Sequence, residues 1–464
     1  MHLIKLFILL FCFSSTLFSQ DPYTQTQFSY DSIIDVDYGT ATDYAGNSVA
    51  LKMDIYKPIN NNCQRPAIIL VHGGAWVGGS KEEMINMSRE LAKKGWVVGA
   101  INYRLGTHKA SNYTMYALCN NSLSAPCGYI SDSSEVYRAN YRGMQDAKGA
   151  IRFLKGRNEL DSIDVNNVFI AGESAGGFVS MATAFTDQLS EKHVSCFEIA
   201  DAPTPDVDLA TYGCVPTPLS LSRPDLGSIE GTLNLGAFDA TVKGVGNFYG
   251  GLLDLNIVPQ ITDTPAVYLF HQGSDVIVNY NYGKLLGRIS WECFAQTNIC
   301  QTYFFYPYAY GSKGIENYFI SLGALSPVYQ SEIIENFTYL NNCFSNGHSI
   351  DNLYLRIQNM ANLFATKIAL SGNVPTTICS ASLVNSDLTA QLRLFPNPSS
   401  EFVSIQYGGN VEAEEIQVLN SQGQIIYSSK INFATINTSM FKNGVYFITL
   451  ITPKSKIVQK YVKE

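Results

Sequence analysis

The chain has 464 residues, which is more than one average domain needs, and 46% of them are hydrophobic, an ordinary share for a globular protein with a sizeable core. Its formal net charge of −8 argues against a nucleic-acid-binding protein, which would need a basic face. No DNA- or RNA-binding motif stands out in the sequence.

The N-terminus has the pattern of a secretory signal peptide over residues 1–20. One lysine precedes an apolar run, and small polar residues follow it. The run is too short to span a bilayer, so we expect cleavage near Ser19 or Gln20 rather than a membrane anchor. A buried N-terminal helix is the alternative. No later segment has the length and apolarity of a membrane span, so we expect no transmembrane segment in the mature chain.

The cysteines suggest disulfides, as is usual in an exported protein. Three pairs lie close in sequence and would each close a short loop: Cys119 with Cys127, Cys196 with Cys214, and Cys293 with Cys300. Cys343 with Cys379 is a weaker pairing and would leave Cys63 free. Spacing alone does not determine the connectivity. No CxxC or His-rich cluster indicates a metal site.

Apolar strands and helical patterns alternate after the leader. Residues 35–58 predict two strands joined by a turn at residues 45–47. The further expected elements are strands at 67–71, 96–102, 168–171, 266–270 and 302–306, and helices at 81–94, at 137–155 and after Ser174. Such alternation predicts a parallel sheet with helices on both faces. Runs that are apolar throughout are typical of strands buried on both sides.

Two stretches interrupt this α/β domain, which we expect to cover residues 21–365. Residues 107–135 are rich in Ser, Asn and Tyr, and residues 309–346 follow a strand and look partly helical. We predict that both are insertions. Long insertions in compact domains are usually lids or binding loops, with surface decoration as the alternative.

The composition changes again near the C-terminus. Residues 366–391 are small and polar, which is typical of a linker. Residues 392–464 contain short alternating strands with turn residues between them, and they predict a small all-β sandwich. This segment contains no His and no Cys, so we expect no chemistry there.

The strongest chemical signal is the segment Gly172–Gly176, with the sequence GESAG. It stands between an apolar strand and a helix, which is the context of a G-x-S-x-G nucleophile elbow. The tight turn would project the Ser174 hydroxyl into a cleft, and the helix N-terminus would favour developing negative charge. A turn without chemistry is the alternative.

A serine nucleophile needs a base, and the base needs an orienting carboxylate. In folds with this elbow the chain order is Ser, then the acid, then His. His348 lies on a loop before a final helix and is the predicted base. Asp275 follows the strand at 266–270 and is the predicted acid.

Other histidines and acids compete for these roles. His193 lies just past the elbow helix and is expected to be solvated, and His271 ends the strand that precedes the acid. Asp263 precedes that strand and is expected to serve a turn or a cap. Asp351 follows His348 and is expected to cap the last helix.

The loop after the strand at 67–71 has the sequence HGGAWVGG and is the predicted oxyanion loop. We assign the oxyanion hole to the backbone N–H groups of Gly74, Ala75 and Ala175. His72 precedes the serine, the wrong order for the base, so we expect it to hold the loop by hydrogen bonding. Trp76 could form a wall of the substrate pocket, and core packing is the equal alternative.

Four motifs together resemble the α/β-hydrolase esterases, near the hormone-sensitive-lipase and feruloyl-esterase-like carboxylesterase groups. They are HGGAW (72–76), NYRL (102–105), GESAGG (172–177) and HQGSD with NGHS (271–275, 346–349). The resemblance covers about residues 36–365. It implies the α/β-hydrolase fold and a serine carboxylic-ester hydrolase that needs no cofactor and no metal. Ala75 stands where the family usually has a third glycine.

The C-terminal segment resembles the type IX secretion sorting domain. The matching segments are LFPNPSS (394–400), GQIIY (423–427) and NGVYFITL (443–450). The resemblance implies that the type IX secretion machinery is a partner and that the protein is secreted or lies at the cell surface. A carbohydrate-binding β-module is the alternative.

Two other functions remain open at this stage. A serine peptidase of the prolyl-oligopeptidase type shares the fold and the order of the triad, but it usually carries a propeller ahead of the hydrolase. A non-catalytic adhesion module could keep the hydrolase shell, but such modules typically lose a triad member. The sequence leaves the ester open: polysaccharide acyl esters, lipid esters and polyesters are all compatible.

Overall fold

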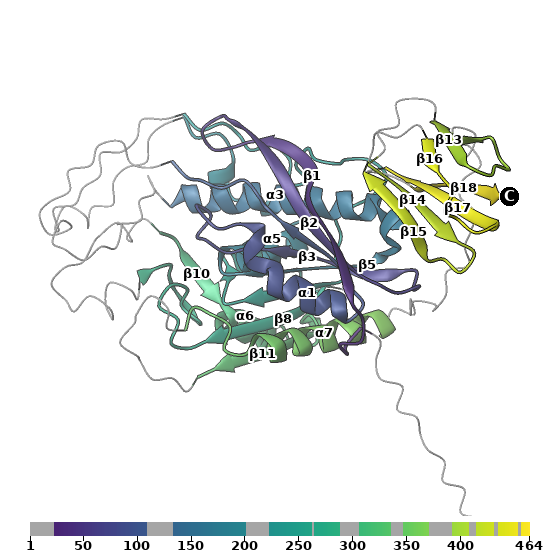
Figure 1. The fold of residues 1–464 in the computed structure, drawn as a ribbon. Coiled ribbons are helices and arrows are strands. Elements are labelled where there is room, and N and C mark those ends of the chain that lie inside the picture. Colours follow the sequence, from purple (N-terminus) through teal and green to yellow (C-terminus); the bar gives the residue numbers. More distant parts are fainter. Residues whose placement is uncertain are drawn as a thin grey trace, which may run out of the picture.

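The computed structural model describes an α/β unit and a C-terminal all-β unit (Figure 1). The described residues are 23–108, 133–200, 222–261, 264–287, 306–335, 347–370, 392–407, 414–430, 435–452 and 456–464. The predicted signal peptide and the greater part of the predicted linker lie outside them. Within the described residues, no helix has both the length and the apolarity to cross a membrane.

An eight-stranded sheet forms the centre of the α/β unit, in the order β1-β2-β4-β3-β5-β6-β8-β11. β1 and β2 pair antiparallel, as do β2 and β4, and the remaining neighbours pair parallel. The strands are β1 (Tyr30–Thr42), β2 (Ser48–Pro58), β3 (Arg65–Val71), β4 (Val97–Ile101), β5 (Ile163–Glu173), β6 (Gly244–Phe248), β8 (Ala266–Gln272) and β11 (Tyr329–Ile334). The mostly parallel sheet confirms the predicted fold class.

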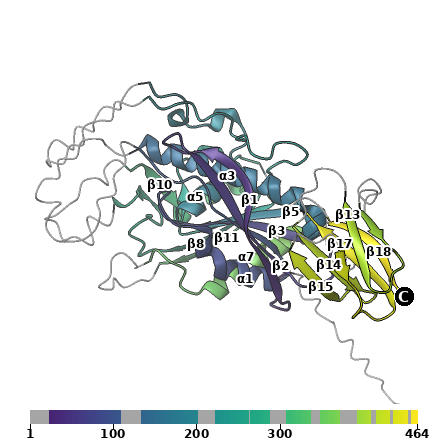
Figure 2. The ribbon, with the colours of Figure 1, turned by 45° about the horizontal axis from the view of Figure 1, so that its top comes forward.

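Helices cover both faces of this sheet (Figures 1 and 2). Successive strand residues point to opposite faces, so Ile68 packs with α1 and α7 while Ile69 packs with α3, α5 and α6. The helices are α1 (Ile85–Lys93), α3 (Ser134–Gly156), the short α4 (Asn158–Asp161), α5 (Ala175–Phe185), α6 (Ser312–Leu322) and α7 (Leu353–Leu370).

Shorter elements fill the connections. A second sheet, β7-β10-β9, consists of β7 (Gly251–Leu252), β10 (Tyr308–Gly311) and β9 (Tyr282–Lys284). The 3-10 turns are η1 (Lys81–Met84), η2 (Leu189–Glu191), η3 (Val194–Cys196), η5 (Leu255–Ile257) and η8 (Gly323–Leu325).

The prediction that residues 309–346 form an insertion is wrong for the first part of that range. α6 and β11 belong to the central architecture, and β11 pairs parallel with β8 as the edge strand. Its sequence, YQSEII, is half-buried throughout and mostly polar at its start, so it lacks the apolar run of a central strand. The other predicted insertion is described only at residues 107–108 and 133–135, and most of the predicted strand 302–306 lies outside the described residues.

The C-terminal unit has two antiparallel sheets, as the alternating pattern predicts. Its own apolar core includes Val403, Val418 and Ile448, all fully buried. The strands are β12 (Leu392–Phe395), β13 (Phe402–Tyr407), β14 (Glu415–Asn420), β15 (Ile425–Lys430), β16 (Thr435–Asn437), β17 (Gly444–Ile451) and β18 (Lys456–Lys463).

Two of the cysteine predictions are wrong. Cys196 is a free, buried thiol in a small apolar cluster with Tyr141 and Met144, so it does not pair with Cys214. Burial raises the pKa of the Cys196 thiol to about 12. Cys63, predicted to be free, is disulfide-bonded. The remaining predicted pairs lie outside the described residues.

Candidate active site

Ser174 lies at a sharp turn between β5 and α5, at the carboxyl edge of the parallel strands. Its backbone has φ 52° and ψ −121°, a region that non-glycine residues rarely adopt. The serine N–H donates to Phe248 O at 2.9 Å, which ties the turn to the end of β6. The strained conformation is the one expected of a nucleophile elbow.

The glycines of the motif are required by close packing. A Cβ on Gly172 would lie 2.2 Å from Gly176 O, and one on Gly176 would lie 2.1 Å from Val71 O. Both distances are far below van der Waals contact, so only glycine lets α5 approach β3 and β5 this closely.

The structure brings the three predicted triad residues together. His348 Nε2 lies 2.8 Å from Ser174 Oγ, and His348 Nδ1 lies 2.8 Å from Asp275 Oδ2. Asp275 is fully buried, whereas the His348 side chain is 15% exposed, so the base can be reached from solvent. These distances lie within hydrogen-bond range for proton transfer from a serine to an imidazole.

The Asp275 carboxylate is held on both oxygens. Oδ1 accepts the backbone N–H groups of Ile277 at 2.8 Å and Val278 at 3.0 Å. Burial acts to raise the pKa of Asp275, but the facing His348 and the hydrogen bonds from His271 and His348 outweigh it and lower that pKa below its ordinary value. The lowered pKa therefore favours the ionised form of Asp275 beside His348.

A glycine, Gly347, lets His348 lie next to Asp275. Gly347 has φ +80°, and a Cβ there would lie 2.4 Å from the backbone N of Asp275. Asp351 does not cap α7, contrary to the prediction, because its carboxylate pairs with Arg356 at 2.8 Å. Asn352 accepts the backbone N–H of Leu355 instead.

The predicted oxyanion loop has an unusual backbone. Gly74, Ala75 and Trp76 have φ values of +105°, +52° and +60° in succession. A Cβ on Gly74 would lie 2.1 Å from Gly78 O, so this position requires glycine. Within the described residues, the N–H groups of Gly74 and Ala75 donate to no acceptor. Ala175, the third predicted donor, begins α5 directly after the serine.

His72 holds this loop, as predicted. Its Nδ1 lies 2.7 Å from Gly73 O, and its ring stacks on Tyr103 with centroids 4.6 Å apart. Burial lowers the pKa of His72 to about 4, against the opposing effect of the hydrogen bond to Gly73. The ring is therefore neutral at physiological pH.

Trp76 packs in the core beneath the loop. It is 3% exposed, contacts Phe178 with ring centroids 5.4 Å apart, and donates its indole N–H to Asn140 Oδ1. This burial favours core packing over the pocket wall. The prediction that His193 is solvated is wrong, because its half-buried ring stacks on Tyr137 at 3.7 Å between centroids.

Two residues that contact the predicted triad were not assigned a role there from the sequence. The ring of Tyr249 lies edge-on to His348 with centroids 4.8 Å apart, and its hydroxyl donates to the half-buried Glu173. His271 Nε2 lies 3.1 Å from Asp275 Oδ2. The position of His271, four residues before the acid, was visible in the sequence, but nothing there indicated Tyr249.

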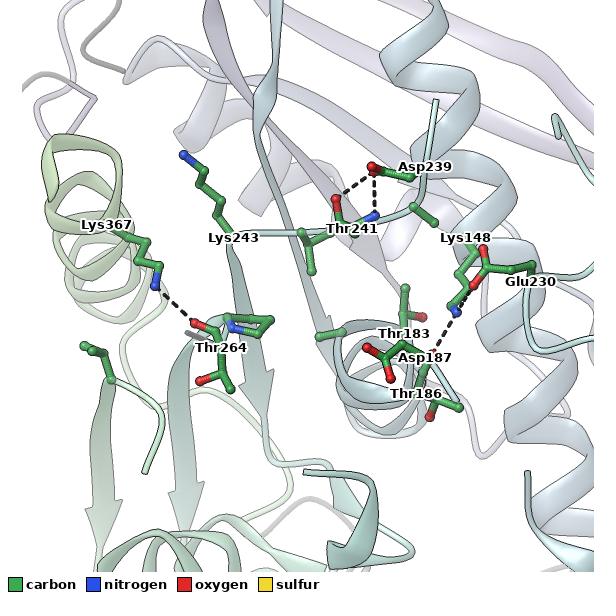
Figure 3. Close-up of a pocket in the computed structure, with 15 residues that line it drawn as sticks. Lys148, Thr183, Thr186, Asp187, Glu230, Asp239, Thr241, Lys243, Thr264 and Lys367 are labelled. Carbon is green, nitrogen blue, oxygen red and sulfur yellow. Dashed lines mark hydrogen bonds and ion pairs between the residues drawn. The ribbon is translucent and has the colours of Figure 1, made fainter. Parts of the chain in front are cut away.

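A cavity of about 640 Å³ lies at the opposite edge of the sheet (Figure 3). Lys243 and Thr264 line it from just before β6 and β8, and Lys148 lines it from α3. Figure 3 shows the Lys367 ammonium donating to Thr264 O, at 3.1 Å. The catalytic candidates lie at the carboxyl ends of the strands, so this cavity is separate from them.

Among the described residues, no group of three or more His, Cys, Asp or Glu side chains is placed to hold a metal ion.

Two family models match parts of the chain. Residues 53–141 match the BD-FAE family, and residues 393–464 match the secretion system C-terminal sorting domain. The first match includes the predicted oxyanion loop, and the second covers all seven strands of the C-terminal unit except the first residue of β12.

Several curated relatives are esterases of low identity. Isoprenylcysteine alpha-carbonyl methylesterase of Arabidopsis thaliana is 25% identical over 147 residues, which are 32% of this chain and 27% of that protein. Para-nitrobenzyl esterase of Bacillus subtilis is 29% identical over 130 residues, 27% of this chain and 22% of that protein. The matched part thus spans about a quarter of these relatives.

Solved structures of esterases are also similar. A propionate-bound esterase from Thermogutta terrifontis has a TM-score of 0.40 and 16% identity. The matched region covers 75% of this chain and 96% of that esterase. A truncated carbohydrate esterase from gut microbiota has a TM-score of 0.39 and 16% identity, covering 75% of this chain and all of its own. Residues 53–141 are thus similar to the BD-FAE family and residues 393–464 to a secretion-system sorting domain, and the mostly parallel sheet of the first unit is consistent with the α/β-hydrolase fold.

Proposed function

We propose that the protein is a secreted serine hydrolase of carboxylic esters and that Ser174, His348 and Asp275 form its catalytic triad. The observation that carries the proposal is the hydrogen-bonded series from Ser174 through His348 to Asp275, with 2.8 Å at each step. The esterase relatives support the reaction class.

Each triad residue has one role in this reaction. Ser174 Oγ bonds to the ester carbonyl carbon while its proton passes to His348 Nε2. Asp275 accepts His348 Nδ1–H throughout, which fixes the ring and stabilises the imidazolium. The tetrahedral intermediate collapses, and the alcohol leaves with the proton from His348.

Water completes the cycle. It gives a proton to His348 and bonds to the acyl carbon, and the carboxylic acid then leaves as Ser174 regains its proton. The N–H groups of Gly74, Ala75 and Ala175 would donate to the oxyanion in both halves, each worth about 3 kcal/mol of transition-state stabilisation. The three consecutive positive φ values from Gly74 to Trp76 support this role, because they orient the loop amides without helix or strand partners.

The serine substitution tests the proposal. Ser174→Ala should lower kcat for p-nitrophenyl acetate by at least about 10³-fold and abolish labelling by a fluorophosphonate probe. The thermal unfolding temperature should change little, because the substitution removes only one hydroxyl. Hydrolysis by Ser174→Ala at the wild-type rate would show that another group is the nucleophile.

Two further measurements separate the alternatives. A peptide substrate cleaved faster than any ester would favour the peptidase, and failure of the wild-type chain to react with the probe would favour an adhesion module. A panel of esters with graded acyl length would then define the substrate, including acyl esters of polysaccharides.

We also propose export through the type IX machinery, on the basis of the match at residues 393–464. The location would then be secreted or cell-surface.

A further inference from the structure

We propose that His271 is a positioning residue: it donates its Nε2–H to the carboxylate of Asp275 and holds the acid in the orientation that His348 needs. The inference rests on the proposed triad and assigns a second histidine to the same carboxylate. His271 is the penultimate residue of β8 and lies four residues before Asp275, and both side chains are fully buried.

The surroundings of His271 select one tautomer of its ring. The backbone N–H of Ser312 donates to His271 Nδ1 at 3.3 Å, so Nδ1 is an acceptor and carries no proton. The ring proton is then on Nε2, which faces two acceptors: Asp275 Oδ2 at 3.1 Å and Val278 O at 3.0 Å. The neutral ring is therefore a donor to the acid.

Both histidines donate to the same carboxylate oxygen. Asp275 Oδ2 receives Nε2–H of His271 and Nδ1–H of His348, while the backbone N–H groups of Ile277 and Val278 hold Oδ1. His348 also contacts Ser174, whereas His271 is a donor to Oδ2 that takes no part in the proposed proton transfer.

His271 is part of a buried group of polar side chains. Asn247, Ser312 and His271 are all fully buried, and Asn247 Nδ2 donates to Ser312 Oγ at 3.3 Å. Burying polar groups costs free energy unless they are hydrogen-bonded, and apolar residues of similar volume are often as stable or more stable. If position 271 served only packing and stability, an apolar side chain there would be sufficient.

Two substitutions at position 271 test the inference in the full-length chain. His271→Leu removes the donor at similar volume, and His271→Gln can present an amide N–H near the position of Nε2. We expect kcat, per active site titrated with fluorophosphonate, to fall about tenfold or more in His271→Leu while KM stays within about twofold. His271→Gln should recover a substantial part of that loss.

The matched control is Ser88→Ala. Ser88 is also fully buried and donates to Met84 O at 2.8 Å, but it lies on α1 at the other face of the sheet. This variant should lose thermal stability and keep the wild-type kcat per titrated site. If His271→Leu does not fold, His271→Asn replaces it, because the shorter amide falls short of Asp275.

The outcomes separate this inference from the proposed function. Wild-type kcat per titrated site in His271→Leu would overturn the positioning role, whatever its unfolding temperature. Equal losses in the Leu and Gln variants would overturn donation by Nε2–H. Activity in Ser174→Ala would instead overturn the triad itself, and the inference with it.

Discussion

At the scale of single residues, several strained backbone conformations lie around the predicted nucleophile Ser174. Ser174, Ala75 and Trp76 all have positive φ values without being glycine. Such conformations cost about 1–3 kcal/mol each and persist only where the surrounding structure enforces them. Here the enforcement comes from the packed glycines of both loops, so each loop presents its groups to the same edge of the sheet.

Glu173, beside Ser174, is a half-buried carboxylate that accepts a hydrogen bond from the neutral Tyr249 hydroxyl. Burial raises the pKa of Glu173, and the hydrogen bond from Tyr249 only partly opposes that rise. A carboxyl group whose pKa is higher in the folded state stabilises the fold below its unfolded pKa of 4.5. That contribution is lost as the pH rises through the folded pKa.

We therefore expect Glu173→Gln to stabilise the protein at high pH relative to wild type. The amide oxygen still accepts from Tyr249, and no charge is buried. The free energy of unfolding of the variant should increase relative to that of the wild type as the pH rises from 4 to 8. Urea unfolding monitored by tryptophan fluorescence measures this difference. All three tryptophans precede the C-terminal all-β unit, so the signal reports unfolding of the α/β unit.

Tyr249→Phe is the matched control for this prediction. It removes the hydroxyl that donates to Glu173 and so should raise the pKa of that carboxyl further. Its stability should fall relative to wild type as the pH rises, in the opposite direction to Glu173→Gln. A pH-independent difference in both variants would contradict the burial of a charge at Glu173.

Sequence reasoning found the triad candidates because histidines are few and their order in this fold is restricted. Only three histidines follow Ser174, and His348 alone lies just before a final helix. The interactions around them were not predictable in the same way. Tyr249 reaches His348 from the end of β6, and only the folded chain shows that these elements are adjacent.

At the scale of elements, a buried ion pair ties β4 to the middle of α3. Arg104 Nη2 lies 2.7 Å from Asp146 Oδ1, and the backbone N–H of Arg104 donates to Oδ2 at 2.8 Å. Asp146 is fully buried, and burial raises its pKa despite the facing guanidinium. The pair fixes where the chain leaves β4.

Removing Asp146 should lower the free energy of unfolding far more than removing an acid from an exposed ion pair. We expect Asp146→Ala to lower the free energy of unfolding by about 3–5 kcal/mol, because it leaves Arg104 unpaired in a buried site. The control is Asp37→Ala, which breaks a pair with Lys52 whose side chains are 69% and 35% exposed. That variant should lose less than about 1 kcal/mol. Similar losses in both variants, measured by urea unfolding, would contradict the structural role of the Arg104 pair.

Element prediction succeeded where strands are apolar runs or alternate polar and apolar residues, and it failed for β6 and β11, which do neither. β3 and β8 are nearly continuous apolar runs, and both were predicted. β6 has the sequence GVGNF and was missed, because its glycines and asparagine are uncommon in strands. A Cβ on Gly246 would lie 2.5 Å from Met360 Sδ, so the glycine is explained by α7 packing over the sheet.

At the scale of the whole molecule, the chain consists of two units with separate cores. The central sheet and the β7-β10-β9 sheet are built from residues before 335, and the two C-terminal sheets are built from residues after 391. Apolar clusters follow the same division. Every triad and oxyanion candidate lies in the first unit, so catalysis and sorting should be separable.

A chain that ends at Gln391 should therefore keep catalysis and lose export. Purified, it should hydrolyse p-nitrophenyl acetate with kcat and KM within about twofold of the full chain, because its core and site are complete without the second unit. Expressed in a host with a type IX system, it should stay with the cells, whereas the full chain should reach the medium or the cell surface. The export control is full-length Ser174→Ala, which should be exported normally without activity. A truncated chain found outside the cells would contradict the sorting role, and a large loss of kcat per titrated site would contradict the independence of the two units.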